Sequence, residues 1–317
     1  MAPRADDLID RRSLRRKLTF WRVATLLVAV AAILAIAAWV HGDGLSGTGS
    51  DHIAKVRIEG TITEDEDLLK RLDRIRKSAT VKGVILAIDS PGGTTAGGEA
   101  VFDAVRELAA EKPVVAQVGT LAASAGYMIA SATDHIIARN TSIVGSIGVL
   151  VQYPDLTGLM DKIGVKMEEV KSSPLKAEPS PFNPTTEPER AMLRAMILDS
   201  YEWFVGIVVD RRPLTRPQVL ALADGAVFTG RQALQNKLVD GIGGEQEAVA
   251  WLGTKGIPAD LKVLEWKPDD RSSFWFGIPL ANAVGEALGL PGAGGEFLRR
   301  SGADRLFLDG LVSVWHP

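Results

Sequence analysis

The chain has 317 residues, a formal net charge of −3, 46% hydrophobic and 24% charged residues, and no cysteine. This length suits one or two domains with a sizeable core, and the composition excludes both a disordered chain and a multi-span membrane protein. The lack of cysteine excludes disulfides, thiolate catalysis, Fe–S clusters and cysteine-ligated zinc. The four histidines follow no metal-ligand spacing, and the acidic balance gives nucleic-acid binding no support. We therefore expect no metal, no other cofactor and no nucleic-acid partner.

The first forty residues have the charge pattern of a membrane anchor. Residues 1–22 contain seven basic and three acidic residues, whereas residues 23–40 are uncharged and almost wholly apolar. Those 18 residues would extend about 27 Å as a helix, close to the thickness of a bilayer's hydrocarbon core. Trp21 and Trp39 stand at its ends, where amphipathic rings favour the interface. We predict a cytoplasmic basic segment over 1–22 and a single transmembrane helix over 23–40.

A cleaved signal peptide is the alternative interpretation of this segment. Ala35-Ile36-Ala37 has the small-x-small form that signal peptidases cut, but the apolar run is longer than a signal core and continues past that site. Residues 41–51 are rich in glycine and serine and indicate a linker. The positive-inside rule puts everything after residue 41 outside the cytoplasm.

Strand and helix patterns alternate from residue 52 to about residue 252. Apolar alternation and apolar runs predict strands over 53–58, 83–89, 113–118 and 135–138. Helical spacing predicts helices over 65–77, 95–110, 122–131 and about 186–210. This order favours an α/β domain built from repeated β-α-β units with right-handed crossovers.

Residues 253–317 form a C-terminal extension with apolar clusters between glycines and prolines. We expect this extension to dock on the preceding domain. A place at an oligomer interface, a place at the membrane surface and a self-docked tail are the alternatives.

Two motifs in the predicted domain could carry chemistry. Asp89-Ser90-Pro91-Gly92-Gly93 ends a buried strand, and its glycines let the backbone turn N–H groups into a cleft that holds an anion or oxyanion. A plain strand-to-helix turn is the alternative. Ser124 follows the next strand and begins a helix of small residues, where the N–H of Ala125 is free to bind an oxyanion. A lone serine at a helix start is commonly only a cap.

A nucleophilic serine needs a base. His135 lies in an apolar strand that favours core packing, and no Asp/His/Ser order is present. The other known base is a lysine that burial keeps neutral. Lys171 and Lys176 are the two candidates in the irregular segment KSSPLKA.

Five motifs together carry a family resemblance. DSPGG, ASAGY, GSIGV, KSSPLKAEPSPF and VFTGRQALQNKLVDGIGG occur in this order behind one N-terminal apolar segment. In this order they resemble signal peptide peptidase A, a family of membrane-bound bacterial serine endopeptidases, in its short, single-repeat form. The resemblance covers about residues 52–250. It implies a fold related to the Clp protease and crotonase superfamily, and a Ser–Lys dyad without histidine.

The resemblance also implies a role for five residues. These are Ser124 as nucleophile, Lys176 as general base, Ser146 as the serine that orients the lysine, and the N–H groups of Gly93 and Ala125 as the oxyanion hole. The family more often has an acidic residue after the lysine, whereas Ala177 follows here, so Lys171 stays as the alternative base.

Membership would further imply a homo-oligomeric ring, with an octamer expected, in which Ser and Lys meet across a subunit boundary. The expected substrates are cleaved signal peptides and other apolar peptides at the periplasmic side of a bacterial inner membrane. Two alternatives on the same fold are a crotonase-like CoA enzyme and a non-catalytic scaffold of membrane quality control.

Overall fold

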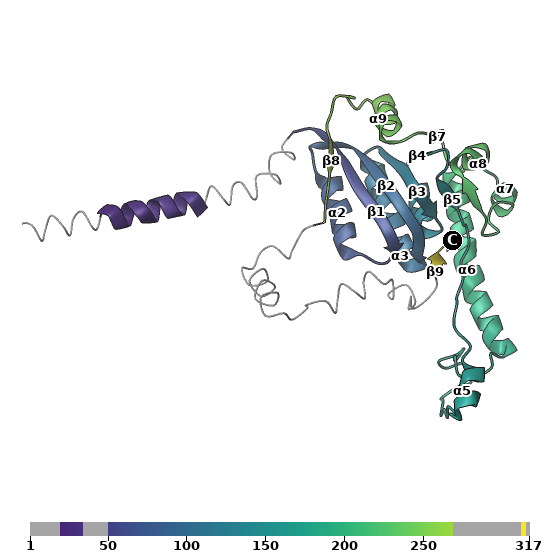
Figure 1. Ribbon diagram of the computed structural model, residues 1–317. Coiled ribbons are helices and arrows are strands. Elements are labelled where there is room, and N and C mark those ends of the chain that lie inside the picture. The colour runs from purple at the N-terminus through teal and green to yellow at the C-terminus, as the bar shows by residue number, and fades with distance from the viewer. Residues whose placement is uncertain (1–19, 34–49, 269–311, 315–317) are drawn as a thin grey trace, which may run out of the picture. The chain divides into compact units, whose positions relative to one another are not determined.

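The computed structural model describes residues 20–33, 50–268 and 312–314, and the chain divides into two compact units, residues 1–51 and 52–317 (Figure 1). The strands of the second unit are β1 (His52–Ile62), β2 (Val81–Thr94), β3 (Val114–Ala123), β4 (His135–Ala138), β5 (Ile143–Gly145), β6 (Val227–Thr229), β7 (Gly241–Ile242), β8 (Val263–Glu265) and β9 (Val312–Val314). Its helices are α2 (Glu66–Lys77), α3 (Thr95–Glu111), α4 (Ala125–Ser131), α5 (Thr157–Ile163), α6 (Glu187–Arg211), α7 (Arg216–Leu220), α8 (Gly230–Gln235) and α9 (Glu245–Thr254).

In the first unit, residues 20–33 form a helix with largely exposed side chains. This helix covers the first part of the predicted transmembrane segment, and residues 34–40 lie outside the described residues. Among the described residues, no helix combines the length and the apolar character needed to cross a membrane. The transmembrane helix over 23–40 therefore stays a prediction.

The described strands form one nine-stranded sheet. Its main order is β6-β5-β3-β2-β1-β8, with β4 beside β3, β7 beside β4 and β9 beside β2. β1, β2 and β3 pair in parallel, and α2 and α3 connect them, which is the predicted β-α-β rhythm. β8 and β9 come from residues after 252, so the sheet also takes strands from the segment predicted as the C-terminal extension.

The sheet is buried on both faces. Ile85 and Leu86 are successive residues of β2, and both are fully buried, but they belong to different apolar clusters. Leu86 packs in the cluster that holds the apolar faces of α2, α3 and α4, and Ile85 packs in the cluster that holds those of α9. Successive side chains of a strand point to opposite faces, so a strand covered on both sides needs an unbroken apolar run.

The helix predicted over 122–131 begins later than expected. Ala122 and Ala123 extend β3, because they pair with Val144 and Gly145 of β5. The strand therefore continues to the residue before Ser124, and α4 begins at Ala125. The turn from strand to helix is thereby compressed into one residue.

α6 continues far beyond the sheet. Near its C-terminal end Phe204 and Val208 are fully buried, whereas Met196 and Leu198 in its middle are exposed. Its N-terminal half and α5 reach away from the sheet as an arm (Figure 1). We call residues 157–198 the arm.

Candidate active site

The segment Asp89–Gly93 at the end of β2, which we call the glycine loop, is held by hydrogen bonds of the Ser90 hydroxyl. Ser90 Oγ donates to Gly60 O at 2.6 Å, and the Gly92 N–H donates to Ser90 Oγ at 3.1 Å. Gly92 has a φ of 109°, a conformation that residues with a Cβ rarely adopt. A Cβ on Gly93 would lie 1.7 Å from Ile62 O, so no larger residue fits there. The two glycines are therefore required by the geometry of this loop.

Ser124 lies in a strained turn. Its φ is 56° and its ψ is −119°, it directly precedes α4, and its side chain is buried. The Ser124 N–H donates to Gly145 O at 2.8 Å, and Ser124 O accepts the first helical hydrogen bond, from Met128 N, at 2.9 Å. The first N–H groups of a helix have no acceptor within the helix, which includes that of Ala125. Strain of this kind in a buried polar residue is typical of functional sites.

The glycine loop and the start of α4 lie against each other. Ser90 is paired with Ala122 across β2 and β3. A Cβ on Gly126 would lie 3.0 Å from Ser90 O, and a Cβ on Gly98 would lie 3.1 Å from Ala125 Cβ. Small residues at these points allow the close packing, so Gly93 and Ala125 come to the same end of the sheet as Ser124.

Ser146 joins this group through β5. Gly145 pairs with Ala123, the residue before Ser124, and Ser146 follows directly. Ser146 has a φ of 52°, is buried, and donates its N–H to Ala226 O at 2.7 Å. The structure therefore brings four of the five predicted site residues together.

A cavity of about 580 Å³ opens beside Ser146. Its walls are mostly apolar and come from the loop after β5, from α6 and from the loop before β6. The side chains of Leu150, Ile197 and Leu198 line it, and Tyr201 Oη donates to Ala223 O at 2.8 Å at its wall. The space suits an apolar group beside Ser146.

Lys176 is not part of this group within one chain. It lies in the segment between α5 and α6, and its side chain is exposed. Figure 1 shows that α5 and the N-terminal half of α6, which this segment joins, lie away from the sheet. Ala177, the departure from the family pattern, has a φ of 61°. The family resemblance implies such a separation, because it expects the serine and the lysine to meet across a subunit boundary.

The alternative bases are poorly suited. Lys171 forms ion pairs with Glu169 and Glu178, and these carboxylates raise its pKa, so the amine stays charged. His135 pairs with Val115 near the start of β3. Val115 precedes Ser124 by nine residues, which is about 30 Å of strand. His135 instead stacks on Trp251 with ring centres 5.0 Å apart.

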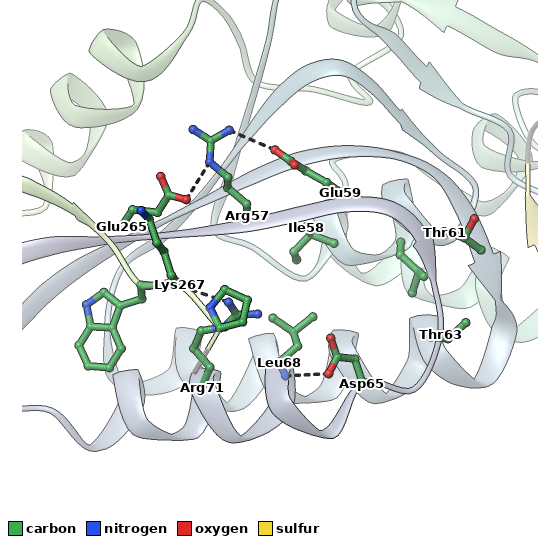
Figure 2. Close-up of a pocket in the computed structure, with 13 residues that line it drawn as sticks. Arg57, Ile58, Glu59, Thr61, Thr63, Asp65, Leu68, Arg71, Glu265 and Lys267 are labelled. Atoms are coloured by element: carbon green, nitrogen blue, oxygen red, sulfur yellow. Dashed lines mark hydrogen bonds and ion pairs between the residues drawn. The ribbon is translucent and has the colours of Figure 1, made fainter. Parts of the chain in front are cut away.

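A second cavity, of about 330 Å³, lies between β1, α2 and the segment around β8 (Figure 2). Arg57 donates to Glu59 and Glu265 at 3.1 Å each, and Arg71 donates to Trp266 O at 3.3 Å. None of the predicted site residues lines this cavity. Its charged groups tie β8 to the sheet.

Comparison with known proteins identifies the family of this chain. The family model of peptidase family S49 matches residues 106–256. A protein of Methanocaldococcus jannaschii named as a protease is 31% identical over 83% of this chain and 91% of its own length. The chain belongs to peptidase family S49.

Other matches agree with the family and the fold. A Synechocystis protein named as a protease is 36% identical over 69% of this chain and 80% of its own length. An Enterococcus faecium protein named as a signal peptide peptidase of the SppA type is 31% identical over 75% of this chain and 74% of its own length. This S49 chain is thus a serine-type protease of the SppA family. The Clp protease model matches residues 54–144, which confirms a Clp protease-like α/β fold.

The resemblance did not assign a role to Ser90 of the DSPGG motif. Its hydroxyl links Gly60 to the backbone of Gly92 and so holds the glycine loop. The only signal in the sequence was a small hydroxyl residue directly before the proline and the two glycines.

Proposed function

We propose that this S49 protease is a membrane-anchored endopeptidase that cuts apolar peptides, above all cleaved signal peptides, with a Ser124–Lys176 dyad. The observation that carries the proposal is the strained, buried turn of Ser124, which joins β3 to α4 beside the glycine loop. The apolar cavity beside Ser146 supports an apolar substrate.

The reaction is acyl transfer through serine. The neutral amine of Lys176 takes the proton of Ser124 Oγ, which attacks the substrate carbonyl carbon. The oxyanion that forms accepts hydrogen bonds from the N–H groups of Gly93 and Ala125. The lysine ammonium then gives its proton to the leaving amine, and water releases the acyl group by the same route. Ser146 orients the amine.

The lysine comes from a neighbouring copy of the chain. Among the described residues of one chain, no suitable base lies beside Ser124, and the arm that carries Lys176 has many exposed apolar side chains. These are Leu159, Ile163, Val165, Met167, Val170 and Leu175. A head-to-tail contact in which the arm packs on the next copy buries them, and such contacts close into a ring. Clp protease-like folds are compatible with a ring, and we propose one here, with eight copies expected.

The membrane anchor and the orientation rest on the N-terminal charge pattern. The basic residues before Val23 and the apolar segment 23–40 favour a cytoplasmic N-terminus and a periplasmic protease domain in a bacterial inner membrane. A reporter that is active only in the periplasm, fused after Pro317, is expected to be active. Activity from a cytoplasmic reporter alone would overturn the orientation.

Mixing two inactive variants tests the dyad and the shared site together. Ser124→Ala and Lys176→Ala are each expected to lose peptide hydrolysis and, for Ser124→Ala, labelling by a serine-reactive phosphonate. Co-assembled in equal amounts, they regain about a quarter of wild-type activity, because a quarter of the boundaries join an intact Ser124 to an intact Lys176. No recovery in mixed rings, with recovery only from a wild-type chain, would place the base in the same chain.

A further inference from the structure

The end of β2 has one edge that faces Ser124. β1 pairs along the other edge, where Thr61 lies opposite Gly92 and Ile62 opposite Gly93. β3 accompanies β2 on the near edge only as far as Ser90, and then turns into Ser124 and α4. Beyond Ser90, the edge of β2 that faces Ser124 therefore no longer pairs with β3.

β9 fills that edge. Its three residues, Val312–Val314, pair antiparallel with Thr94, Gly93 and Gly92, and Figure 1 shows β9 beside the end of β2. A strand has only two edges for main-chain hydrogen bonds. Because β1 holds one of them at Gly92 and Gly93, β9 lies on the edge that faces Ser124. The segment reaches this position from about 220 residues away in the chain.

An extended peptide that presents a carbonyl group to Ser124 and to the N–H groups of Gly93 and Ala125 would need the same edge. Such strand addition draws its affinity from main-chain hydrogen bonds, so any extended segment can compete for it. A tethered segment competes at an effective concentration that can reach the millimolar range. A substrate peptide at lower concentration must displace it.

We propose that residues 312–314 occupy the substrate position as an intramolecular competitor that restrains the protease. This inference rests on the proposed function, because it assigns the edge of Gly92–Thr94 to the substrate backbone. If β9 is docked about nine-tenths of the time, the apparent KM for a peptide rises about ten-fold and kcat does not change. Regulation then amounts to any event that draws the segment away from β2.

Proline substitutions in β9 provide the test in the full-length chain. Hydrogen-bonded and non-bonded positions alternate along an antiparallel pair. Ser313→Pro and the double variant Val312→Pro/Val314→Pro therefore cover both phases, and proline cannot donate to a ladder. Ser313→Thr, which keeps the N–H and favours a strand, is the matched control.

Two measurements separate the competitor from the proposed activity. Deuterium exchange at the amides of Gly92–Thr94 is measured in a Ser124→Ala background, and the kinetics of a fluorogenic apolar peptide are measured with Ser124 intact. We expect at least one proline variant to exchange faster at Gly92–Thr94 and to show a KM several-fold lower at unchanged kcat, with Ser313→Thr like wild type.

Unchanged exchange in both proline variants would overturn the docking itself, whatever the activity. Faster exchange with an unchanged KM would show that β9 docks but does not compete, which also overturns the proposal. If no variant, wild type included, hydrolyses peptide, the proposed function fails and with it the competition. The exchange data then still report whether β9 docks.

Discussion

Two serines with positive φ directly follow adjacent strands at the candidate site. Ser124 follows β3 and Ser146 follows β5, with φ values of 56° and 52°. Each gives its N–H to a backbone carbonyl, that of Gly145 or that of Ala226. Residues other than glycine rarely adopt such backbone angles, and these angles persist only where the surrounding structure enforces them. Here the hydrogen bonds from the two N–H groups to neighbouring backbone hold both residues in this conformation.

Gly93 is the residue most sensitive to a small change. In Gly93→Ala the new Cβ would overlap the carbonyl oxygen of Ile62, so β1 and β2 must separate at the glycine loop. We expect a loss of about 2 kcal/mol in the free energy of unfolding, and a fall of about 100-fold in kcat as an oxyanion donor moves away. Urea denaturation and peptide hydrolysis measure the two effects. Gly206→Ala in α6, where a Cβ would have open space, is the control and gains up to about 1 kcal/mol. Wild-type kcat in Gly93→Ala would remove Gly93 from the oxyanion hole.

The proposed base gives a prediction on pH. Lys176→Arg is expected to be inactive at every working pH, because a guanidinium stays protonated and cannot take the proton of Ser124. Lys171→Arg is the matched control. Lys171 is held charged by Glu169 and Glu178, which raise its pKa, and arginine keeps that charge. Turnover in Lys176→Arg would exclude Lys176 as the base and leave Lys171 or His135 as the candidates. Loss of activity in Lys171→Arg would then favour Lys171.

At the scale of elements, the arm and the sheet differ in what buries them. β1, β2 and β3 are covered on both faces within one chain. α5 has no buried residue, and Val170 after it is fully exposed. Exposed apolar residues in this number on one segment are typical of an interface. The arm is therefore the element whose environment a second copy would change most.

Val170→Glu tests the arm. The substitution is expected to weaken ring assembly about ten-fold or more, because it introduces a charge into a contact that is apolar in the ring. The fold of the single chain should not change, because the side chain touches nothing there. Light scattering measures the assembly, circular dichroism the fold, and peptide hydrolysis should fall in parallel with assembly. Leu234→Glu on α8, also exposed, is the control. An intact ring in Val170→Glu would exclude this part of the arm from the interface.

At the scale of the whole protease domain, an ion pair around a buried arginine joins elements that are distant in sequence. Arg212, which follows α6, donates to both carboxylate oxygens of Asp240 at 2.7 and 3.0 Å. Asp240 also accepts from Ile136 N of β4 at 2.8 Å. Nearby, Tyr127 Oη of α4 donates to Leu238 O at 2.9 Å. The start of α4, and with it the turn at Ser124, is thereby tied to the segment that carries Asp240.

Asp240→Asn is expected to destabilise the domain by about 3 kcal/mol near neutral pH, because it leaves the buried Arg212 without its counter-charge. Burial acts to raise the pKa of Asp240, but the hydrogen bonds and charge of Arg212 outweigh it, and the net pKa is lowered. The stability that the Asp240 carboxylate contributes is thus complete above the pKa of an unfolded aspartate, about 3.9, and it is lost as the pH falls through the lower pKa of Asp240 in the folded protein. Urea denaturation across this range should show the variant and wild type converging in acid.

The exposed carboxylate of Asp73 is the control for that experiment. It pairs with Arg76 and Lys77 at the surface, so Asp73→Asn should change stability little at any pH. A gap between Asp240→Asn and wild type that stays constant into acid would show that the lost charge is not the cause.

The family, the repeated β-α-β units and the candidates for nucleophile and oxyanion hole can all be predicted from the amino-acid sequence alone. These are local features: an apolar run such as residues 83–89 reports burial on both faces, and DSPGG or ASAGY reports a turn within a few residues. Which distant segments pair in the sheet could be read only from the folded chain. β3 continues to Ala123 because β5 is there to pair with it. β8 and β9 join β1 and β2 from far along the chain. Periodicity shows that a face is buried but does not identify the partner that buries it, because that partner is selected by long-range packing and hydrogen bonding.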